Sequence, residues 1–351
     1  MFKAKIYGAG SIGAHYAHAL VNNGFEVDIF DISKDALLRF KKKIYPIRYK
    51  FFSDKITILE KDIDKKYDLV IIGTQPTSHY KIVEKNLKRD VKIIHIEKPL
   101  CSSFNRDIEN FKKLKLYKKT LISVGYNHVL TEVCKKSLEI LKKNKFGKIQ
   151  YIESETKEHW DNIFNAHFWL KKVNDSYLGN SKFGGGALHE HSHALHLAHF
   201  FLKKINTKDE FKKVFCQMQF KSGRNYYYDS LSKLEIITKK NILISIHQDL
   251  VSKKSSKKLH LEFEKGYLTL SINYKSNLDL IKYKLNNKRE NQIKFKKKRS
   301  DDFLGTVNNY KRYLAKTKFN KDLNLNDSLK IMKTIRASFL SNKKRKIISI
   351  K

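Results

Sequence analysis

Residues 5–13 read Lys-Ile-Tyr-Gly-Ala-Gly-Ser-Ile-Gly, which is a short apolar strand running into the pattern G-x-G-x-x-G. Each glycine has a physical task in such a turn. Gly8 permits the tight turn itself, Gly10 lets the backbone approach a pyrophosphate, and Gly13 lets the following helix pack close to the strand. This stretch therefore predicts the first turn of a dinucleotide-binding unit.

The residues after the glycine loop complete that unit. A helix is expected over residues 14–22. The unpaired N–H groups at its N-terminus, with Ser11 and Ile12 in the loop, would hold the phosphates because the helix dipole favours negative charge. A second apolar strand, residues 25–30, closes on Asp31. A carboxylate there accepts hydrogen bonds from ribose hydroxyls and would repel the 2′-phosphate of NADP, so NAD is the expected cofactor and NADP the alternative.

Length and composition limit the class of protein. The 351 residues suffice for about two domains. No apolar run is long enough to cross a membrane, the N-terminus lacks the regions of a signal peptide, and the three cysteines show no metal or disulfide spacing. We expect a cytoplasmic protein without a membrane partner.

The formal net charge of +38 raises the question of a nucleic-acid partner. The lysines, however, are spread along the whole chain, and the one dense basic run, residues 294–299, has Phe295 as its only aromatic residue. Charge alone gives only non-specific affinity for nucleic acid. We therefore expect no specific nucleic-acid partner, and a surface that attracts anionic small molecules.

Two domains are expected from the pattern of strands and helices. Residues 1–124 alternate short apolar strands with amphipathic helices, which predicts a doubly wound parallel sheet, the Rossmann arrangement. Residues 125–351 contain longer alternating segments, which predict an α+β domain with a large, mostly antiparallel sheet that has one open face. Ligands bind beyond the carboxyl ends of the strands in a parallel sheet. The binding candidates at those ends are Thr74, Pro76, His79, Glu97, Lys98, Tyr126 and Asn127.

Lys98, at the end of a predicted strand, is the first candidate for chemistry. A lysine there can donate a hydrogen bond to a substrate hydroxyl or take part in proton transfer. Pro99 limits it to an extended conformation. In a chain this rich in lysine, a solvated side chain is the alternative.

Three glycines, residues 184–186, lead into a predicted helix that reads Ala-Leu-His-Glu-His-Ser-His-Ala-Leu-His. His189, His193 and His196 would share one face of that helix because of their spacing, and histidine is the side chain best suited to accept a hydroxyl proton near neutral pH. Two other interpretations stay open. Residues 189–193 match H-E-x-x-H, a zinc-site pattern, and the histidines could be packing residues. We expect no metal, because the sequence offers no identifiable third ligand.

Aromatic residues ahead of this helix offer a platform for a sugar or nicotinamide ring. Trp160 and His167 are the candidates, because mixed aromatic and polar linings are typical of small-ligand pockets. Core packing is the more common use of such residues.

These motifs together resemble the Gfo/Idh/MocA oxidoreductase family, named for glucose–fructose oxidoreductase and inositol dehydrogenase, over nearly the whole chain. The motifs that carry the resemblance are the Gly8-Gly10-Gly13 loop, Asp31, Thr74-Gln75-Pro76 with His79, Glu97-Lys98-Pro99, Gly125-Tyr126-Asn127, and Gly184-Gly185-Gly186-Ala187-Leu188 followed by Ser192-His193. The resemblance implies that Lys98 and His193 are the catalytic pair, that the second domain shapes a sugar site, and that subunits form a homodimer or homotetramer through their open sheet faces. The expected substrate-binding residues are Lys98, Tyr126, Asn127, Trp160, His167, His189 and His193.

The chain departs from the family at several of these positions. The nearest subgroup usually continues S-H-E-x-D, where this chain has Ala194 and His196, and the family often places Asp where this chain has His189. After G-Y-N the common arginine is replaced by His128. These differences concern the proton relay and therefore the substrate.

The sequence as a whole predicts an NAD(P)-dependent oxidoreductase that moves a hydride between nicotinamide and a hydroxyl or keto carbon of a sugar. A nucleotide-linked or otherwise anionic sugar of surface-polysaccharide synthesis is the expected substrate class. The alternative is a non-catalytic dinucleotide-binding regulatory protein on the same fold, because fold does not fix function.

Overall fold

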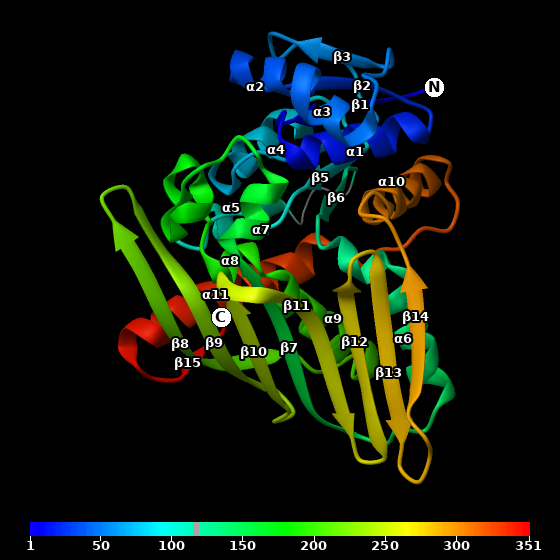
Figure 1. Cartoon of the computed structure of the whole chain (residues 1–351), viewed down its shortest axis with the longest axis vertical. Helices are drawn as coiled ribbons and strands as arrows, with labels where there is room; N and C mark the ends of the chain where they lie inside the picture. Colours follow the sequence, from blue (N-terminus) through cyan, green and yellow to red (C-terminus); the bar gives the residue numbers. More distant parts are fainter. Residues whose placement is uncertain (115–118) are drawn as a thin grey trace. The chain divides into compact units, whose positions relative to one another are not determined.

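The structure is a computed structural model that describes residues 1–114 and 119–351 (Figure 1). The chain divides into two compact units, each made of three segments. The first unit comprises Met1–Cys101, Glu109–Asn127 and Arg299–Asn326, and the second comprises Ser102–Ile108, His128–Lys298 and Asp327–Lys351. The expected boundary at residues 124/125 lies close to one of these junctions. The expectation that everything after it forms the second domain is corrected by the segment Arg299–Asn326, which returns to the first unit.

The first unit is built on a parallel sheet of six strands in the order β3-β2-β1-β4-β5-β6. The strand order reverses beside β1, which is where a doubly wound sheet binds its ligand. Apolar side chains bury both faces, as the continuous hydrophobic strands predict. The strands are β1 (Phe2–Tyr7), β2 (Phe25–Phe30), β3 (Ile56–Leu59), β4 (Leu69–Ile72), β5 (Ile93–Ile96) and β6 (Leu121–Val124).

A helix from late in the sequence, α10, packs on the first helix of this unit, α1. The rings of Phe303 and His15 stack with centroids 4.6 Å apart, and the Lys311 ammonium donates to the Asn23 carbonyl at 3.0 Å. Helix α2 begins after Ser33, whose hydroxyl caps it by accepting from the Ala36 N–H at 3.2 Å. The helices are α1 (Ser11–Asn22), α2 (Lys34–Arg39), α3 (Tyr45–Tyr49), α4 (His79–Leu87), α5 (Asp107–Lys113) and α10 (Asp301–Leu314), with a π-helical turn over Phe40–Ile44.

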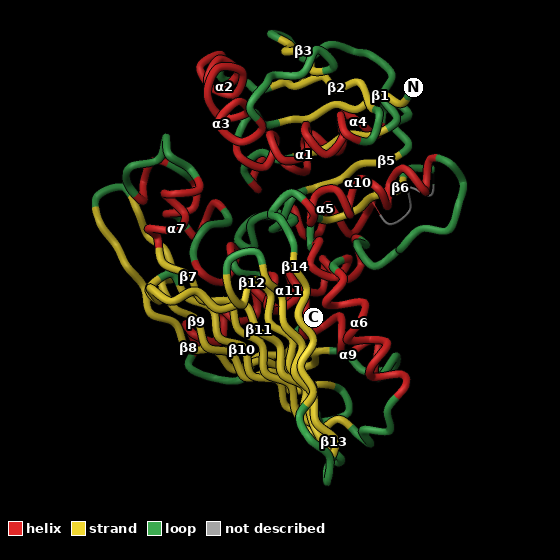
Figure 2. The backbone as a smooth tube through the Cα atoms, turned by 45° about the vertical axis from the view of Figure 1, so that its right-hand side comes forward, coloured by secondary structure: helices red, strands yellow, loops and turns green. Residues whose placement is uncertain are grey.

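The second unit is built on a sheet of nine strands in the order β14-β13-β12-β11-β7-β10-β9-β8-β15 (Figure 2). Neighbouring strands are antiparallel except β7 and β10, which are parallel. This confirms the predicted large, mostly antiparallel sheet. The strands are β7 (Ile149–His159), β8 (Phe211–Gly223), β9 (Tyr226–Thr238), β10 (Leu243–Asp249), β11 (Val251–Phe263), β12 (Gly266–Lys275), β13 (Leu278–Leu285), β14 (Asn291–Lys296) and β15 (Ile348–Ser349).

Helices of the second unit cover one face of this sheet. Helix α9 packs on the central strands β11, β7 and β10, and α6 packs on β12 and β13. Helix α11 is tied to β8 through Ser341, whose hydroxyl accepts from the Cys216 N–H at 3.0 Å. Along β7 the side chains alternate between buried Ile152 and exposed Tyr151, as expected for a sheet with one covered face. The helices are α6 (Glu132–Lys143), α7 (Trp160–Ala166), α8 (Ala187–Glu190), α9 (His193–Ile205) and α11 (Leu325–Lys344). Among all helices in the described part of the chain, none combines the length and apolar character that a membrane crossing requires.

Candidate functional site

The glycine loop follows β1 directly, and the chain itself requires two of its three glycines. Gly8 has a φ of +107°, and a Cβ there would lie 2.6 Å from the Gly73 carbonyl oxygen. A Cβ on Gly13 would collide with the carbonyl oxygen of Gly8. The tight turn and the close approach of α1 that the sequence predicts are therefore confirmed.

Gly10 is different, because nothing in the chain requires a glycine at this position. Its φ is −99°, which any residue adopts, and a Cβ there would meet no atom within 4 Å. Gly10 is the N-cap of α1, and no side chain caps the N–H groups of the first turn. Open space beside uncapped N–H groups at a helix N-terminus fits a diphosphate.

Asp31 holds the glycine loop against the end of β2. One oxygen of its carboxylate accepts from the Ala9 N–H at 2.9 Å, and the other accepts from the Ser33 N–H at 2.9 Å. A carboxylate offers about four acceptor sites, so capacity remains for ribose hydroxyls. The residues of the first unit therefore fit the adenosine diphosphate half of a dinucleotide.

Replacing Gly10 by valine tests this site without disturbing the fold. We expect the variant to unfold at the same urea concentration as the wild type, because the new side chain enters open space. NADH affinity, measured by isothermal titration calorimetry, should fall at least about tenfold, which is about 1.4 kcal/mol. Gly13→Ala is the matched contrast, because its Cβ meets backbone and should destabilise the fold by about 1–3 kcal/mol. If Gly10→Val bound NADH as tightly as the wild type, the NADH phosphates would not lie at Gly10.

His79 joins the loops that follow β4 and β5. Its Nδ1 lies 3.0 Å from the Leu100 carbonyl oxygen, and its Nε2 lies 3.0 Å from the Thr74 carbonyl oxygen. The side chain is fully buried and fixes these two loops, and its expected contact with the cofactor stays a prediction. Thr74 is partly exposed, and its hydroxyl lies 2.7 Å from that of Ser78. Pro76 is buried at the start of the short helical turn.

Glu97 and Lys98 follow β5 at the same edge of the sheet. Lys98 is partly exposed and its peptide bond to Pro99 is cis. The Glu97 carboxylate is buried, accepts from the Lys98 N–H at 3.3 Å, and packs so closely on β6 that a Cβ on Gly125 would lie 2.6 Å from it. Glycine at position 125 is therefore a requirement of the packing against Glu97.

A buried polar network keeps Glu97 ionised. His95 Nε2 lies 3.1 Å from a Glu97 oxygen and 2.8 Å from the Tyr16 hydroxyl, while His95 Nδ1 lies 2.6 Å from the Tyr310 hydroxyl. Burial alone would raise the pKa of Glu97, but the hydrogen bond and charge of His95, with the charge of Lys98, lower the pKa below its ordinary value. One signal for this network is visible in the sequence, the histidine inside the apolar strand Ile-Ile-His-Ile, and sequence reasoning missed it.

In the second unit a buried carboxylate holds the triple-glycine turn. Asp229 on β9 accepts from the Ser181 hydroxyl at 2.7 Å, the Leu188 N–H at 2.7 Å and the Ser232 hydroxyl at 3.1 Å. Gly186 has a φ of +83°, and a Cβ there would collide with this carboxylate. Burial raises the pKa of Asp229 to about 6, against the lowering effect of these hydrogen bonds. Asp229 was not identified from the sequence, because nothing local distinguishes it from a solvated strand residue.

The histidine-rich stretch is two helices rather than the continuous helix that the sequence predicts. Helix α8 ends at Glu190 and α9 begins at His193, so the spacing does not place the three histidines on one helical face. His189 is fully buried, with Nδ1 3.1 Å from the Gly185 carbonyl oxygen and Nε2 accepting from the Ser103 N–H at 3.2 Å. His189 is therefore a packing residue in the structure, and its expected contact with substrate stays a prediction.

His193 differs from the histidines around it because its side chain is partly exposed, while those at positions 189, 191, 196 and 199 are buried. Its ring stacks on that of His128, with centroids 4.0 Å apart and ring planes at 21°. Among the histidines of this stretch, His193 is therefore the one whose side chain reaches the surface.

The buried histidines predict how stability depends on pH. Burial lowers the pKa of His189 to about 4 and that of His196 to about 3. The unfolded chain protonates both near pH 6.5, so their contribution to stability is complete above that pH and is lost as the pH falls toward the folded-state values. Asp229 acts in the opposite sense, because its raised pKa favours the folded state at low pH. The stability lost through the two histidines on acidification should exceed the stability gained through the one aspartate.

We therefore expect the urea midpoint of unfolding to fall as the pH is lowered from about 6.5 to about 4.5. His196→Leu should flatten this dependence, because it removes one of the two groups. A midpoint that stays constant or rises on acidification would contradict the neutral, buried state of these histidines.

The remaining substrate candidates divide into buried and partly exposed residues. Trp160 lies in a hydrophobic cluster with Ile163, and its indole N–H donates to the Tyr228 hydroxyl at 3.0 Å. Tyr126 is fully buried and Asn127 nearly so. Trp160 and Tyr126 are therefore core residues in the structure, and the expected stacking platform of Trp160 and His167 stays a prediction. His167 is partly exposed, with Nδ1 2.8 Å from the Ile163 carbonyl oxygen. Within the described residues, no group of three or more His, Cys, Asp or Glu side chains is arranged to hold a metal ion.

Comparison with known proteins finds a family model that matches the first unit. Residues 2–126 match the model GFO_IDH_MocA, which is described as an oxidoreductase family with an NAD-binding Rossmann fold. This part of the chain is therefore similar to the NAD-binding domain of that family. Its glycine loop, Asp31 and the Glu97–Lys98 end of β5 all fall within the matched residues. No curated protein sequence matches the chain.

Solved structures share the fold of the whole chain, beyond the Gfo/Idh/MocA domain. Levoglucosan dehydrogenase in complex with NADH and levoglucosan is 12% identical, with a TM-score of 0.78 over 100% of this chain and 99% of that chain. An oxidoreductase from Agrobacterium radiobacter, in complex with NAD+, L-tartaric acid and magnesium, is 14% identical, with a TM-score of 0.75 over 99% and 98% of the two chains. A super-repressor mutant of Gal80p from Saccharomyces cerevisiae is 13% identical, with a TM-score of 0.76 over 99% and 97%.

Proposed function

We propose that the protein is an NAD-dependent oxidoreductase that transfers a hydride between nicotinamide and a hydroxyl or keto carbon of a sugar. The observation that carries this proposal is the edge of the first unit's sheet, where the open Gly10 turn, the Asp31 carboxylate and the Glu97–Lys98 pair follow β1, β2 and β5. Levoglucosan dehydrogenase, whose fold this chain shares, supports a sugar as the substrate.

The bound nicotinamide would supply the hydride acceptor or donor. In the oxidation direction, His193 would accept the proton of the substrate hydroxyl as that oxygen becomes a carbonyl. Lys98 would donate a hydrogen bond to the same oxygen and stabilise the negative charge that develops on it. The ionised Glu97 fixes the backbone of Lys98 through the hydrogen bond to its N–H. The partial exposure of both Lys98 and His193 is consistent with these roles.

The net charge of the protein bears on which kind of sugar it binds. A net charge of +38 concentrates anionic metabolites near the protein. We infer that the sugar carries a phosphate, a carboxylate or a nucleotide, as in the precursors of surface polysaccharides. Its binding should weaken as the ionic strength rises, because salt screens such attraction.

A screen of turnover tests the proposal. The protein is incubated with NAD and a panel of neutral, phosphorylated and nucleotide-linked sugars, and with NADH deuterated at C4 and the matching keto sugars. For at least one sugar and its matching keto sugar, we expect reaction in both directions. The sugar should reduce NAD to NADH, and the keto sugar should gain one deuterium on carbon from the deuterated NADH. Anionic sugars should be turned over with the higher kcat/KM. Tight NADH binding without turnover of any sugar would contradict the proposal.

The second candidate is a non-catalytic regulatory protein that binds a dinucleotide. The observation in its favour is that the Gal80p mutant, named as a repressor, shares the fold of the entire chain. The positions at which the chain departs from its family, His189, Ala194 and His196, are buried. They therefore leave the partly exposed His193 in place, which favours the enzyme. The screen separates the two candidates.

We also propose that the chain forms a homodimer or homotetramer in the cytoplasm. The polar face of the nine-stranded sheet, with exposed Tyr151 and Glu153 on β7, would provide the contact. Sedimentation-velocity analysis at several protein concentrations would test this assembly, and a monomer at all concentrations would exclude it.

A further inference from the structure

His128 lies outside the residues that match the family model, and the proposed reaction gives it no step, yet its ring touches that of the proposed base. Its imidazole stacks on that of His193 with a centroid separation of 4.0 Å and ring planes at 21°. Both residues belong to the second unit, which begins its long segment at His128. The contact joins the helical turn Asn127–Leu130 to the first residue of α9.

The backbone of His128 is held firmly by its neighbours. Its carbonyl oxygen accepts from the Thr131 hydroxyl at 2.6 Å and from the Thr131 N–H at 3.1 Å. Thr131 in turn is the N-cap of α6, which packs on β12 and β13. His128 itself is 6% exposed. Its ring therefore stands on a rigid base.

His193, by contrast, starts a helix and is partly exposed. A side chain at such a position samples several rotamers unless something holds it, and a ring that must meet a substrate proton loses rate when its orientation is not fixed. Stacking contacts the face of a ring, whereas a hydrogen bond occupies one of the nitrogens at its edge. Stacking is thus a way to orient an imidazole without consuming its proton-accepting atom.

We propose that His128 is a positioning residue that orients the imidazole of His193 by stacking on it. The proposal rests on the proposed role of His193 as proton acceptor. If His128 acts only by stacking, a flat apolar ring at position 128 should keep the His193 ring oriented. A side chain of similar volume without a flat ring should not.

Two substitutions separate stacking from every other property of His128. His128→Leu fills the space but offers no ring, and His128→Phe restores the ring without nitrogen atoms or charge. Both lose the polar interactions of His128 equally, so their difference reports the stack. We expect His128→Leu to lower kcat by about 10- to 100-fold, with KM and the NADH dissociation constant within about threefold of the wild type. His128→Phe should recover kcat to within about threefold.

The same pair is compared by proton NMR, which does not depend on activity. The His193 ring protons should show an upfield ring-current shift in the wild type and in His128→Phe, and should lose it in His128→Leu. The proposal is overturned if His128→Leu keeps the wild-type kcat, if Leu and Phe lower kcat equally, or if the ring-current shift is absent from the wild type. His193→Ala is the reference. If it keeps the wild-type kcat, the proposed function of His193 fails and the positioning role fails with it, whereas an inactive His193→Ala with a fully active His128→Leu overturns the positioning role alone.

Discussion

Replacing Lys98 by methionine or His193 by alanine should lower kcat by about 10²- to 10⁴-fold, the range expected for removing a positioned proton-transfer or charge-stabilising group. Both interactions strengthen as the substrate oxygen changes between hydroxyl and carbonyl, so kcat and kcat/KM should fall together. Steady-state kinetics with the sugar that the turnover screen identifies would measure the effect.

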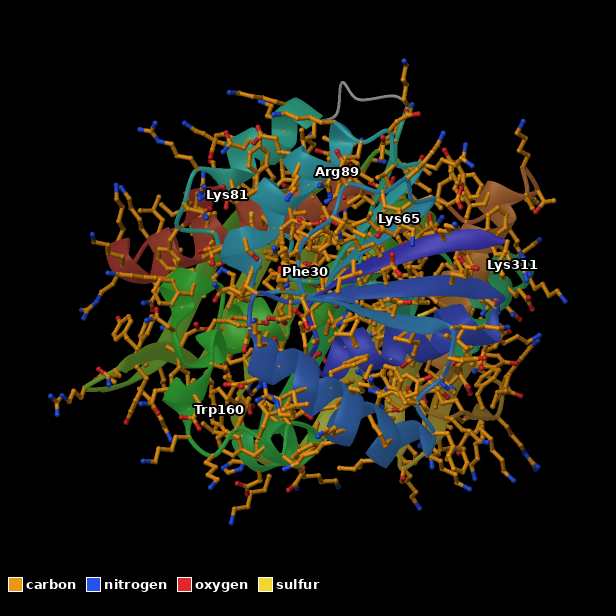
Figure 3. The ribbon with its side chains drawn as sticks, turned by 90° about the horizontal axis from the view of Figure 1, so that it is seen from above. Phe30, Lys65, Lys81, Arg89, Trp160 and Lys311 are labelled. Carbon is orange, nitrogen blue, oxygen red and sulfur yellow. The ribbon has the colours of Figure 1, made fainter. Side chains whose placement is uncertain are left out.

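The matched control answers the objection that one lysine among many has no special role. Lys81 on α4 is exposed and visible at the surface in Figure 3. Lys81→Met removes the same charge and volume as Lys98→Met, and it should leave kcat within about twofold. If Lys98→Met and His193→Ala both kept kcat within about threefold of the wild type, they would not be the catalytic pair.

The second large effect concerns a buried ammonium in β1. Lys5 is fully buried, is bonded to Asp62, and faces the rings of Tyr7, Tyr67 and Phe30 at 5.0, 5.4 and 5.7 Å. Burial lowers the pKa of Lys5, and the hydrogen bond and charge of Asp62 oppose this. Asp62→Ala should therefore destabilise the fold by about 3–5 kcal/mol, because it leaves a buried charge without its counter-ion.

Urea unfolding measures this change in the free energy of unfolding. Two further variants test whether the change comes from the unpaired charge of Lys5. Lys5→Met in the Asp62→Ala background should recover most of the loss, since it removes the stranded charge and keeps the volume. Asp64→Ala is the control. Asp64 pairs with Arg89 at 3.0 Å but its side chain is 79% exposed, so its loss should cost less than about 1 kcal/mol. Both Arg89 and Phe30 can be located on the first unit in Figure 3. Purely additive effects of Asp62→Ala and Lys5→Met would contradict the proposed coupling.

The features that sequence patterns predicted correctly are local ones. The glycine loop and the strand that ends at Asp31 each depend on residues within a few positions of one another. Backbone sterics and hydrogen-bond capacity alone therefore decide them. The alternating pattern likewise predicted a large open-faced sheet without indicating which strands are neighbours.

The features that were missed depend on contacts between distant residues. Tyr310 reaches His95 across 215 positions of sequence, and no periodicity marks its helix as a partner of the first unit. The histidine-rich stretch shows the same limit. Residues 191–192 contain neither glycine nor proline, yet the helix is interrupted there. His189, whose ring contacts Ser103 from a distant part of the chain, is drawn into the core.

The most direct test of the central claim is a fluorescence titration of the purified protein with NADH and NADPH, repeated for Asp31→Ala. We predict saturable binding of one NADH per chain, weaker binding of NADPH, and a shift of preference toward NADPH in Asp31→Ala because the repulsion of the 2′-phosphate is removed. Absence of binding to either nucleotide, or binding that Asp31→Ala leaves unchanged in strength and preference, would contradict the dinucleotide site on which the account depends.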